Sequence, residues 1–185
     1  MQGHAATAFR YTCGQFGYLT DFQLTDAIKS CYETRQMFTA TQRIRVEWAH
    51  CDPAGIIFNP HYYLWMDSGT HALLQAAGFD LIGQTHSDKL FRGCPLVASN
   101  MSFRKPLYFG DVVVCSSQVE RFGNTSFVVV HEFRRGDQAQ AVASGSEVRV
   151  WGYADADDPA KLVARAMPDE VRMMLSVDKT VDVTV

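Results

Sequence analysis

A short stretch of the chain combines an acid, a tight turn and a predicted helix start. Asp52 comes directly before Pro53-Ala54-Gly55, and Asn59-Pro60 follows a few residues later. Proline and glycine bend the backbone, while asparagine before proline is typical of an N-cap followed by the first helical residue. Because a helix start offers unpaired N–H groups and partial positive charge, a polarised carbonyl could rest there while the Asp52 carboxylate approaches its carbon.

Asp52 also has a simpler interpretation. An aspartate before Pro-Ala-Gly is often a turn former, because its side chain caps local backbone N–H groups. As a catalyst it would either attack the carbonyl or deprotonate the attacking water, and the sequence leaves both open. The neighbouring His50 and Cys51 suggest a Cys-His-Asp triad. Consecutive residues of an extended chain point to opposite sides, so we expect Cys51 to face away and His50 to serve in packing.

The elements on either side of this stretch can be predicted from the spacing of apolar residues. Apolar and polar residues alternate from Phe38 to Trp48, which predicts a strand with one buried face. A helix is expected from His61 to Ala77 and ends at Gly78. Small residues recur along this helix, so a sheet could wrap closely around it. These are Ser68, Gly69, Ala72, Ala76 and Ala77.

The second half of the chain predicts a run of strands. Gly123-Asn124 and Arg135-Gly136-Asp137 read as turns between them, and a short helix is expected from Pro168 to about Leu175. A strand, a long helix and then four antiparallel strands predict one sheet curled around one central helix. The four strands are expected over residues 96–106, 111–121, 125–135 and 138–153.

The same motifs resemble a known family. Asp52-Pro53-Ala54-Gly55-Ile56, then Asn59-Pro60-His61-Tyr62 and Trp65-Met66-Asp67, are similar to the hot-dog-fold acyl-CoA thioesterases, in particular the 4-hydroxybenzoyl-CoA thioesterase-like branch. The similarity covers residues 39–175 and includes the run 96–103. It implies an α+β hot-dog fold, with one curved antiparallel sheet wrapped around a long central helix. It further implies hydrolysis of an acyl-CoA thioester to free acid and coenzyme A, without a metal or redox cofactor.

The resemblance also implies roles for individual residues. Asp52 matches the family's catalytic carboxylate, and backbone N–H groups near Asn59 would polarise the carbonyl, leaving the Asn59 side chain as a helix cap. Asp67, two residues after Trp65, would receive a phenolic hydroxyl of the substrate. Its alternative is a solvent-facing acid or one paired with a basic neighbour, because burial without a partner is costly. Trp65 and Cys94 join this substrate-binding set, although a small core residue is also expected at Cys94.

Binding of the coenzyme A phosphates calls for Arg or Lys at the surface. The family's basic run before a Ser-Phe pair is absent, since this chain has Gly123-Asn124-Thr125-Ser126 there. We expect Thr125 and Ser126 at the coenzyme A site, with basic residues from elsewhere. The candidates are Lys161 and Arg165, or else Arg134 and Arg135, each of which could equally be a solvated charge.

Composition narrows the function class. The chain has 185 residues, 47% of them hydrophobic, which suits one domain with a sizeable core. A net charge of −3 argues against a nucleic-acid partner. The 5 cysteines form no CxxC pair, so neither a zinc site nor a disulfide framework is indicated. With neither a secretory signal nor a bilayer-spanning run in the sequence, we expect no membrane partner and a cytoplasmic location.

Three divisions of the chain and several alternatives remain as expectations. Residues 1–37 form an extension, with either a helix over 25–36 or a disordered segment, which could be an overextended start before Met37. Residues 38–175 form the thioesterase domain and 176–185 a C-terminal tail. A homo-oligomer is expected, because an edge strand and the outer sheet face need cover, and the resemblance implies a homodimer or homotetramer. The rival functions are a broad-specificity short-chain acyl-CoA or acyl-carrier-protein thioesterase, and an acyl-CoA-binding protein without catalysis. A hydroxyacyl dehydratase is disfavoured because its His-glycine-proline context is absent.

Overall fold

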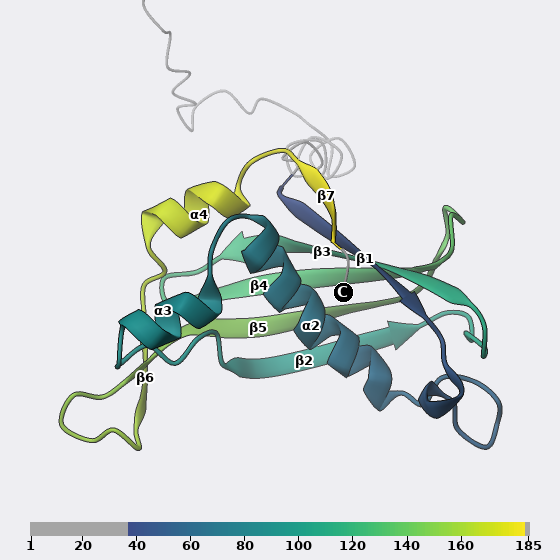
Figure 1. Ribbon diagram of the computed structural model, residues 1–185, viewed down its shortest axis with the longest axis horizontal. Coiled ribbons are helices and arrows are strands. Elements are labelled where there is room, and N and C mark those ends of the chain that lie inside the picture. The colour runs from purple at the N-terminus through teal and green to yellow at the C-terminus, as the bar shows by residue number, and fades with distance from the viewer. Residues whose placement is uncertain (1–36, 184–185) are drawn as a thin grey trace, which may run out of the picture. The chain divides into compact units, whose positions relative to one another are not determined.

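The computed structural model describes residues 37–183 (Figure 1). The helix expected over 25–36 lies outside this range. In chain order the elements are β1 (Thr39–Arg45), the short 3₁₀ turn η1 (Trp48–His50), α2 (Pro60–Ala76), α3 (Leu81–Ser87), β2 (Leu96–Phe103), β3 (Val112–Phe122), β4 (Ser126–Arg135), β5 (Ala141–Ala154), β6 (Leu162–Arg165), α4 (Asp169–Leu175) and β7 (Thr180–Val183).

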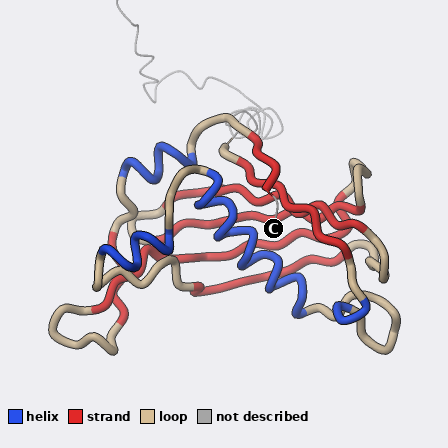
Figure 2. Tube along the Cα trace, in the orientation of Figure 1, coloured by secondary structure: helices blue, strands red, loops and turns tan. Residues whose placement is uncertain are grey.

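The strands form one sheet, with α2 lying across one of its faces (Figures 1 and 2). The strand order is β2-β5-β4-β3-β1-β7, and β6 pairs with β5 beyond this path. Neighbouring strands are antiparallel except β1 and β7, which run parallel. The α+β class and the single sheet around a long helix are therefore confirmed.

The long helix α2 begins and ends within one residue of the predicted bounds, His61 and Ala77. Pro60 occupies its first turn, and Gly78 follows its end with a φ of +102°, a conformation that glycine adopts readily. Gly69 lets the helix approach the sheet, because a Cβ there would lie 2.6 Å from the Ser117 hydroxyl. The small residues predicted on this helix thus include one that the packing requires.

The core has two apolar parts separated by a polar layer. One part lies beneath the first half of α2 around Tyr62, Trp65 and Met66, and the other beneath its end around Leu73 and Leu74. Burying each large apolar side chain contributes roughly 1.5–3 kcal/mol. Between the two parts, α2 faces polar side chains of the sheet that are almost fully buried. They are Ser117, His131, Glu147 and Arg149, together with Thr70 on the helix itself.

Two short strands were not predicted. β6 pairs with the end of β5 after the polar turn, and β7 pairs in parallel with β1. The segment 176–185, which we assigned to a tail, therefore contributes β7 to the sheet. Both strands have four residues, too few for the alternation of side chains to be recognised. Within residues 37–183 no helix is long and apolar enough to span a membrane.

Candidate active site

The loop between η1 and α2 holds Asp52 in a turn closed by its own backbone. The Asp52 N–H donates to the Ile56 carbonyl at 2.9 Å, and the Gly55 N–H donates to the Asp52 carbonyl at 2.9 Å. Gly55 has a φ of +77°, which favours glycine. Asp52 Oδ1 accepts the Ala54 N–H at 2.8 Å, as expected for a turn former. Oδ2 has no hydrogen-bond donor among residues 37–183, so one carboxylate oxygen remains available.

The helix α2 begins directly after the hydrogen bond that closes this loop. The Phe58 N–H donates to the His50 carbonyl at 2.9 Å, which closes the loop. The N–H groups of His61 and Tyr62 bond to the carbonyls of Phe58 and Asn59. The Asn59 N–H has no acceptor in the described part of the chain. This backbone donor, beside the positive end of the helix dipole, can bind a carbonyl oxygen.

Our expectation of a side-chain cap at Asn59 is wrong. Asn59 occupies the N-cap position, but its side chain makes no capping hydrogen bond. Its φ of −46° and ψ of −38° are helical, whereas a capping side chain normally needs an extended N-cap backbone to reach the following N–H groups. The backbone N–H of Asn59 remains a donor whether or not the Asn59 side chain caps the helix.

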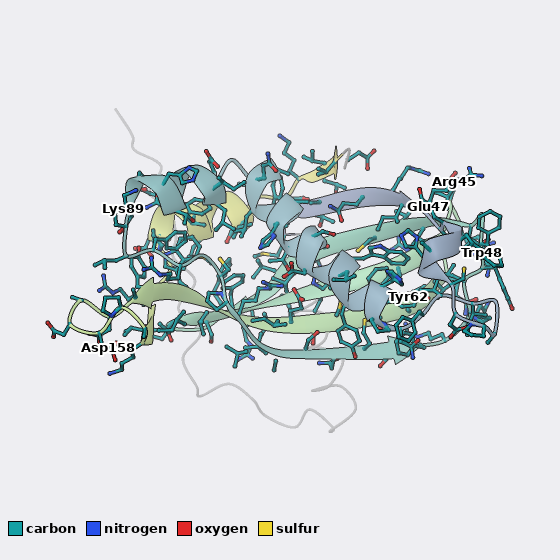
Figure 3. The ribbon with its side chains drawn as sticks, turned by 60° about the horizontal axis from the view of Figure 1, so that its bottom comes forward. Arg45, Glu47, Trp48, Tyr62, Lys89 and Asp158 are labelled. Carbon is teal, nitrogen blue, oxygen red and sulfur yellow. The ribbon has the colours of Figure 1, made fainter. Side chains whose placement is uncertain are left out.

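A cavity of about 270 Å³ opens beside this helix start. Ile57, Tyr62 and Leu107 form buried parts of its wall, and Asn59 and Phe103 line it nearer the surface. Figure 3 shows Tyr62 at the same end of the sheet as Trp48 and Glu47. The cavity therefore offers an apolar compartment next to the candidate carbonyl site. Its remaining lining residues are Ile56, Arg104, Lys105 and Pro106.

The residues flanking Asp52 do not form a triad. The Cys51 thiol lies 3.8 Å from the Glu47 carbonyl, and His50 Nδ1 accepts the Glu47 N–H at 3.0 Å. The His50 ring packs edge-on against His61 at 4.8 Å and Trp65 at 5.5 Å between ring centroids. His50 thus has a packing role, as expected, and Cys51 bonds to neither His50 nor Asp52.

Asp67 is tied to the sheet by a buried arginine. Its half-exposed carboxylate accepts a hydrogen bond from Arg149 Nη2 at 2.5 Å, while Oδ2 lies 4.0 Å from His71 Nδ1. Arg149 also donates to Glu147 Oε2 at 2.9 Å and to the Cys94 carbonyl at 3.0 Å. The ion-paired alternative for Asp67 is what the contacts show, and one of its oxygens still faces outward. Arg149 brings Asp67 and the backbone of Cys94 together.

Burial sets the chemistry of two groups in this cluster. Burial raises the pKa of the Cys94 thiol to about 12, so the thiol is uncharged. Burial alone would raise the pKa of Glu147, but the His131 ring nitrogen 3.5 Å away and the hydrogen bonds from Arg149 and Thr70 outweigh it and lower that pKa to about 2. Glu147 is therefore a permanent anion beside Arg149 at neutral pH. Cys94 supplies backbone, rather than a reactive sulfur, to the cluster.

The predicted coenzyme A residues lie at the other end of the sheet. Ser126 pairs with Val150, next to the pair between Trp151 and Arg165. The Lys161 N–H bonds to the carbonyl of Asp158, which Figure 3 shows far from Tyr62. One chain therefore does not bring Thr125, Ser126, Lys161 and Arg165 to Asp52. Lys161 lies 3.9 Å from Asp155, and Arg165 stacks on Tyr153 at 4.4 Å.

The alternative arginines and one additional arginine also have local partners. Arg134 pairs with Glu132, and Arg135 pairs with Asp111 at 3.0 Å. Arg172 of α4 was not singled out from the sequence, yet it donates to the Gly123 carbonyl of the β3–β4 turn at 2.8 Å. A cation thus reaches this turn although the turn itself has none. The sequence does not reveal this cation, because Arg172 is far from Gly123 along the chain and only the fold brings them together.

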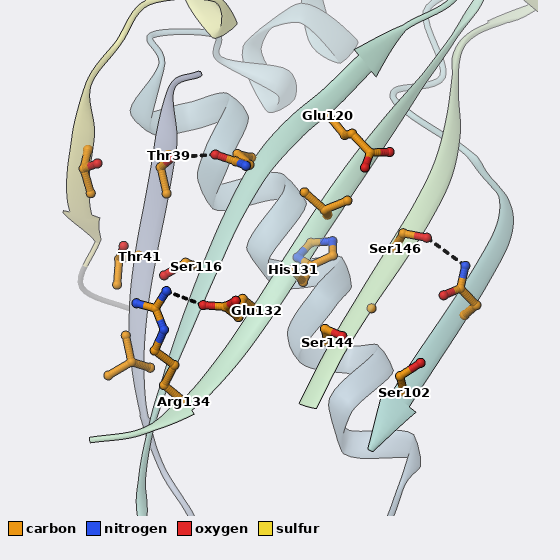
Figure 4. Close-up of a pocket in the computed structure, with 16 residues that line it drawn as sticks. Thr39, Thr41, Ser102, Ser116, Glu120, His131, Glu132, Arg134, Ser144 and Ser146 are labelled. Atoms are coloured by element: carbon orange, nitrogen blue, oxygen red, sulfur yellow. Dashed lines mark hydrogen bonds and ion pairs between the residues drawn. The ribbon is translucent and has the colours of Figure 1, made fainter. Parts of the chain in front are cut away.

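A second hollow of about 780 Å³ lies on the sheet face turned away from α2 (Figure 4). Short polar side chains line most of it, including Thr41, Ser116, Ser144 and Ser146. It contains no residue of the Asp52 loop, so we do not assign it to catalysis. Because its lining is polar, this surface can be hydrated by water and does not need a bound ligand or protein to cover it.

Comparison with solved structures defines the class. The chain superposes on 4-hydroxybenzoyl-CoA thioesterase in complex with 4-hydroxybenzoyl-CoA with a TM-score of 0.68 and 28% identity, over 75% of this chain and 99% of the other. A gentisyl-coenzyme A thioesterase gives a TM-score of 0.60 and 31% identity over 74% and 99% of the two chains. The fold is therefore the hot-dog fold of the acyl-CoA thioesterases.

Sequence comparison agrees. The family model described as the thioesterase superfamily matches residues 54–142. The 4-hydroxybenzoyl-CoA thioesterase of Pseudomonas sp. (strain CBS-3) is 30% identical over 120 residues, which cover 63% of this chain and 85% of that protein. The chain belongs to the thioesterase superfamily and is a thioester hydrolase of the acyl-CoA type.

Proposed function

We propose that the chain hydrolyses the coenzyme A ester of an aromatic, hydroxylated acid of the 4-hydroxybenzoate type. The observation that carries this proposal is the loop that presents a free Asp52 oxygen and the unpaired Asn59 N–H beside an apolar cavity. Two relatives named above act, by their names, on hydroxylated benzoyl esters, which supports the same acyl class. A broad short-chain acyl-CoA or acyl-carrier-protein thioesterase is the alternative.

The proposed chemistry places the thioester carbonyl at the start of α2. The Asn59 N–H donates to the carbonyl oxygen, where one such donor is typically worth about 3 kcal/mol in the transition state. Asp52 then attacks the carbonyl carbon, or removes a proton from the attacking water. The thiolate of coenzyme A leaves as the carbon–sulfur bond breaks. If Asp52 is the nucleophile, water then hydrolyses the acyl-Asp52 anhydride, which releases the free acid and restores the carboxylate. The buried Trp65 beneath this region supports the wall of the acyl site.

Replacing Asp52 by asparagine tests this assignment. The amide keeps an oxygen for the Ala54 N–H but can act neither as nucleophile nor as base, so kcat should fall by more than about 100-fold. Asp158→Asn is the matched control, because Asp158 also caps its own turn through the Ala160 N–H and lies at the opposite end of the sheet. Thiol release from a panel of aryl and alkyl esters measures both. A loss within about tenfold, or 1.4 kcal/mol, would reject a catalytic Asp52.

A non-catalytic acyl-CoA-binding protein is the third candidate. The same assay decides against it if any ester releases thiol in an Asp52-dependent manner. Binding of the esters without thiol release would favour it instead.

Asp67 is proposed to recognise the ring hydroxyl with the oxygen that Arg149 leaves free. A site built for a hydroxyl discriminates strongly against the analogue that lacks it. We expect kcat/KM for 4-hydroxybenzoyl-CoA to exceed that for benzoyl-CoA by well over about tenfold. Asp67→Asn keeps an acceptor for Arg149 and should remove most of this preference. An unchanged ratio would leave Asp67 with only the structural pairing to Arg149.

The complete site is proposed to need a second copy of the chain. β2 is a sheet edge, and its Leu96, Val97 and Phe103 are exposed. An edge strand has unpaired backbone groups that a second strand can satisfy. A homodimer formed there, and doubled to a homotetramer, would allow Lys161 and Arg165 of one copy to serve the Asp52 loop of another. The distance between the two sets within one chain supports this proposal.

A further inference from the structure

Four polar side chains join α2 to β5 through a closed set of contacts, the polar clamp. Asp67 and Thr70 lie one turn apart on α2, while Glu147 and Arg149 lie on one face of β5. The Thr70 hydroxyl donates to Glu147 Oε2 at 2.7 Å, and Arg149 Nε donates to the same oxygen at 2.9 Å. Arg149 Nη2 donates to Asp67 Oδ1 at 2.5 Å. The contacts run from Asp67 through both strand residues and return to the helix at Thr70, so each member limits the movement of the next.

The polar clamp reaches the surface at Asp67. Thr70 is 0% exposed, Glu147 1% and Arg149 3%, whereas the Asp67 side chain is 50% exposed. Hydrogen bonds in a buried environment of low dielectric constant are stronger than in water. The three buried members therefore form a rigid support, and Asp67 is the member of the four that a ligand can contact.

The exposed end of the polar clamp can only accept hydrogen bonds. Arg149 uses Nε for Glu147 and Nη2 for Asp67. Its Nη1 donates to the Cys94 carbonyl, so every nitrogen of this buried guanidinium has a partner. Asp67 is the carboxylate of an ion pair with Arg149, and an ionised carboxylate has acceptors but no donor. Its Oδ2 lies 4.0 Å from His71 Nδ1, which is beyond hydrogen-bond range. A substituent that meets Asp67 must therefore donate a hydrogen bond.

We propose that Thr70 and Glu147 are positioning residues for recognition of the acyl ring. Acting through Arg149, they hold Asp67 as a fixed acceptor, so the site selects a ring substituent that donates a hydrogen bond. Hydroxyl and amino groups both donate, whereas a fluorine of similar size does not. The inference rests on the proposed function, in which Asp67 meets the ring substituent. The substrate class then includes 4-aminobenzoyl esters, and the selectivity depends on buried residues that do not touch the substrate.

Three coenzyme A esters measure this selectivity. The 4-hydroxybenzoyl and 4-aminobenzoyl esters each carry a donor, and the 4-fluorobenzoyl ester is close to them in size but carries none. We define the donor preference as kcat/KM for a donor ester divided by kcat/KM for the fluoro ester. In the wild type it should exceed about tenfold for both donor esters, because the fluoro ester leaves Asp67 unpaired. A preference for neither donor ester, or for the hydroxyl ester alone, would overturn the inferred selection of a donor.

Variants of the two buried residues test their positioning role. Thr70→Val keeps the shape of the side chain but removes the hydroxyl that donates to Glu147, so both donor preferences should fall by at least about threefold. Thr70→Ser keeps the hydroxyl and should retain the wild-type preference. Glu147→Gln removes the charge that faces Arg149 and should lower the preference by at least about tenfold. An unchanged preference in either Thr70→Val or Glu147→Gln would overturn the role of that residue.

A control on the same helix separates loss of position from loss of stability. Leu73→Ala removes a fully buried apolar side chain one turn after Thr70 and lowers stability, but it leaves the polar clamp complete. Its donor preference should stay within about twofold of wild type. The effect of Thr70→Val should also vanish in the Asp67→Asn background, because Thr70 acts through Asp67. A similar loss of preference in Leu73→Ala, or an undiminished effect of Thr70→Val in Asp67→Asn, would overturn the inference.

Calorimetry separates failure of the inference from failure of the proposed function. The Kd of each ester is measured for Asp52→Asn and for the same variant with Thr70→Val added. If the wild type cleaves none of the esters, the proposed function fails. Tighter binding of both donor esters, weakened at least about threefold by Thr70→Val, would still support the inference. Equal Kd values for the donor and fluoro esters would overturn the inference, whatever the rate of hydrolysis.

Discussion

Replacement of Glu147 by glutamine removes the buried negative charge beneath α2. Glu147 is 1% exposed and accepts hydrogen bonds from Thr70 at 2.7 Å and from Arg149 at 2.9 Å. Removing one partner of a buried ion pair usually costs about 3–5 kcal/mol, because the other charge is left uncompensated. Glutamine can still accept from Thr70, and Arg149 keeps Asp67. We therefore expect the free energy of unfolding to fall by about 3 kcal/mol.

Urea denaturation measures this change against a surface pair of similar geometry. With an m-value of about 2 kcal/mol/M, the midpoint should fall by roughly 1.5 M. Arg43→Gln is the control, because Arg43 and Asp137 are 2.8 Å apart but exposed to solvent. Exposed pairs contribute little, so this midpoint should stay within experimental error.

Equal midpoint shifts for Glu147→Gln and Arg43→Gln would refute the reasoning, because burial would then not determine the cost. A second comparison addresses the uncompensated charge itself. Adding Arg149→Met to Glu147→Gln removes the buried cation as well, and should recover part of the lost stability. A double variant less stable than the single variant would mean that Arg149 acts mainly through its other contacts.

The remaining predictions concern acid stability, packing and assembly. Because the pKa of Glu147 is lowered from 4.5 to about 2, its stabilisation is complete above pH 4.5 and is lost as the pH falls toward 2. Thermal unfolding over this range should show a steeper fall for wild type than for Glu147→Gln. Gly69→Ala should lower Tm despite the better helix propensity of alanine, because its Cβ would lie 2.6 Å from the Ser117 hydroxyl; an unchanged Tm would show that Ser117 moves aside. Light scattering at micromolar concentration should show a dimer or tetramer, and a monomer alone would contradict the proposed pairing at β2.

Much of the fold could be predicted because its signals are local. The long helix follows from its proline start and its glycine end, and the β3–β4 turn follows from Gly123-Asn124. The site loop could be located for the same reason, since acid, turn residues and helix start are consecutive in the sequence. The short strand β7 could not be predicted, because its partner β1 is far away in the sequence, at the start of the domain. Pairing between distant segments leaves no local pattern.

The polar layer shows a different limit. Along β5, Glu147 and Arg149 alternate with Val148 and Val150, and alternation alone would place the valines in the core. The structure does the opposite, since the two charged residues are buried and the valines are partly exposed. The register is set by Trp151 on the same face, which is 1% exposed in the core. Two charges can face inward only because Thr70 and Asp67 of α2 meet them there.

Stability and the proposed catalysis therefore depend on different parts of the molecule. The Asp52 loop is held by its own backbone hydrogen bonds, and its acid contributes one turn-capping contact that asparagine can reproduce. The buried Arg149, in contrast, connects Asp67 on α2 to Glu147 on β5. A change at Asp52 should alter rates while leaving the unfolding midpoint in place. A change at Arg149 should alter stability and the proposed recognition of a ring hydroxyl together, because the same guanidinium contacts Asp67 on α2 and Glu147 on β5.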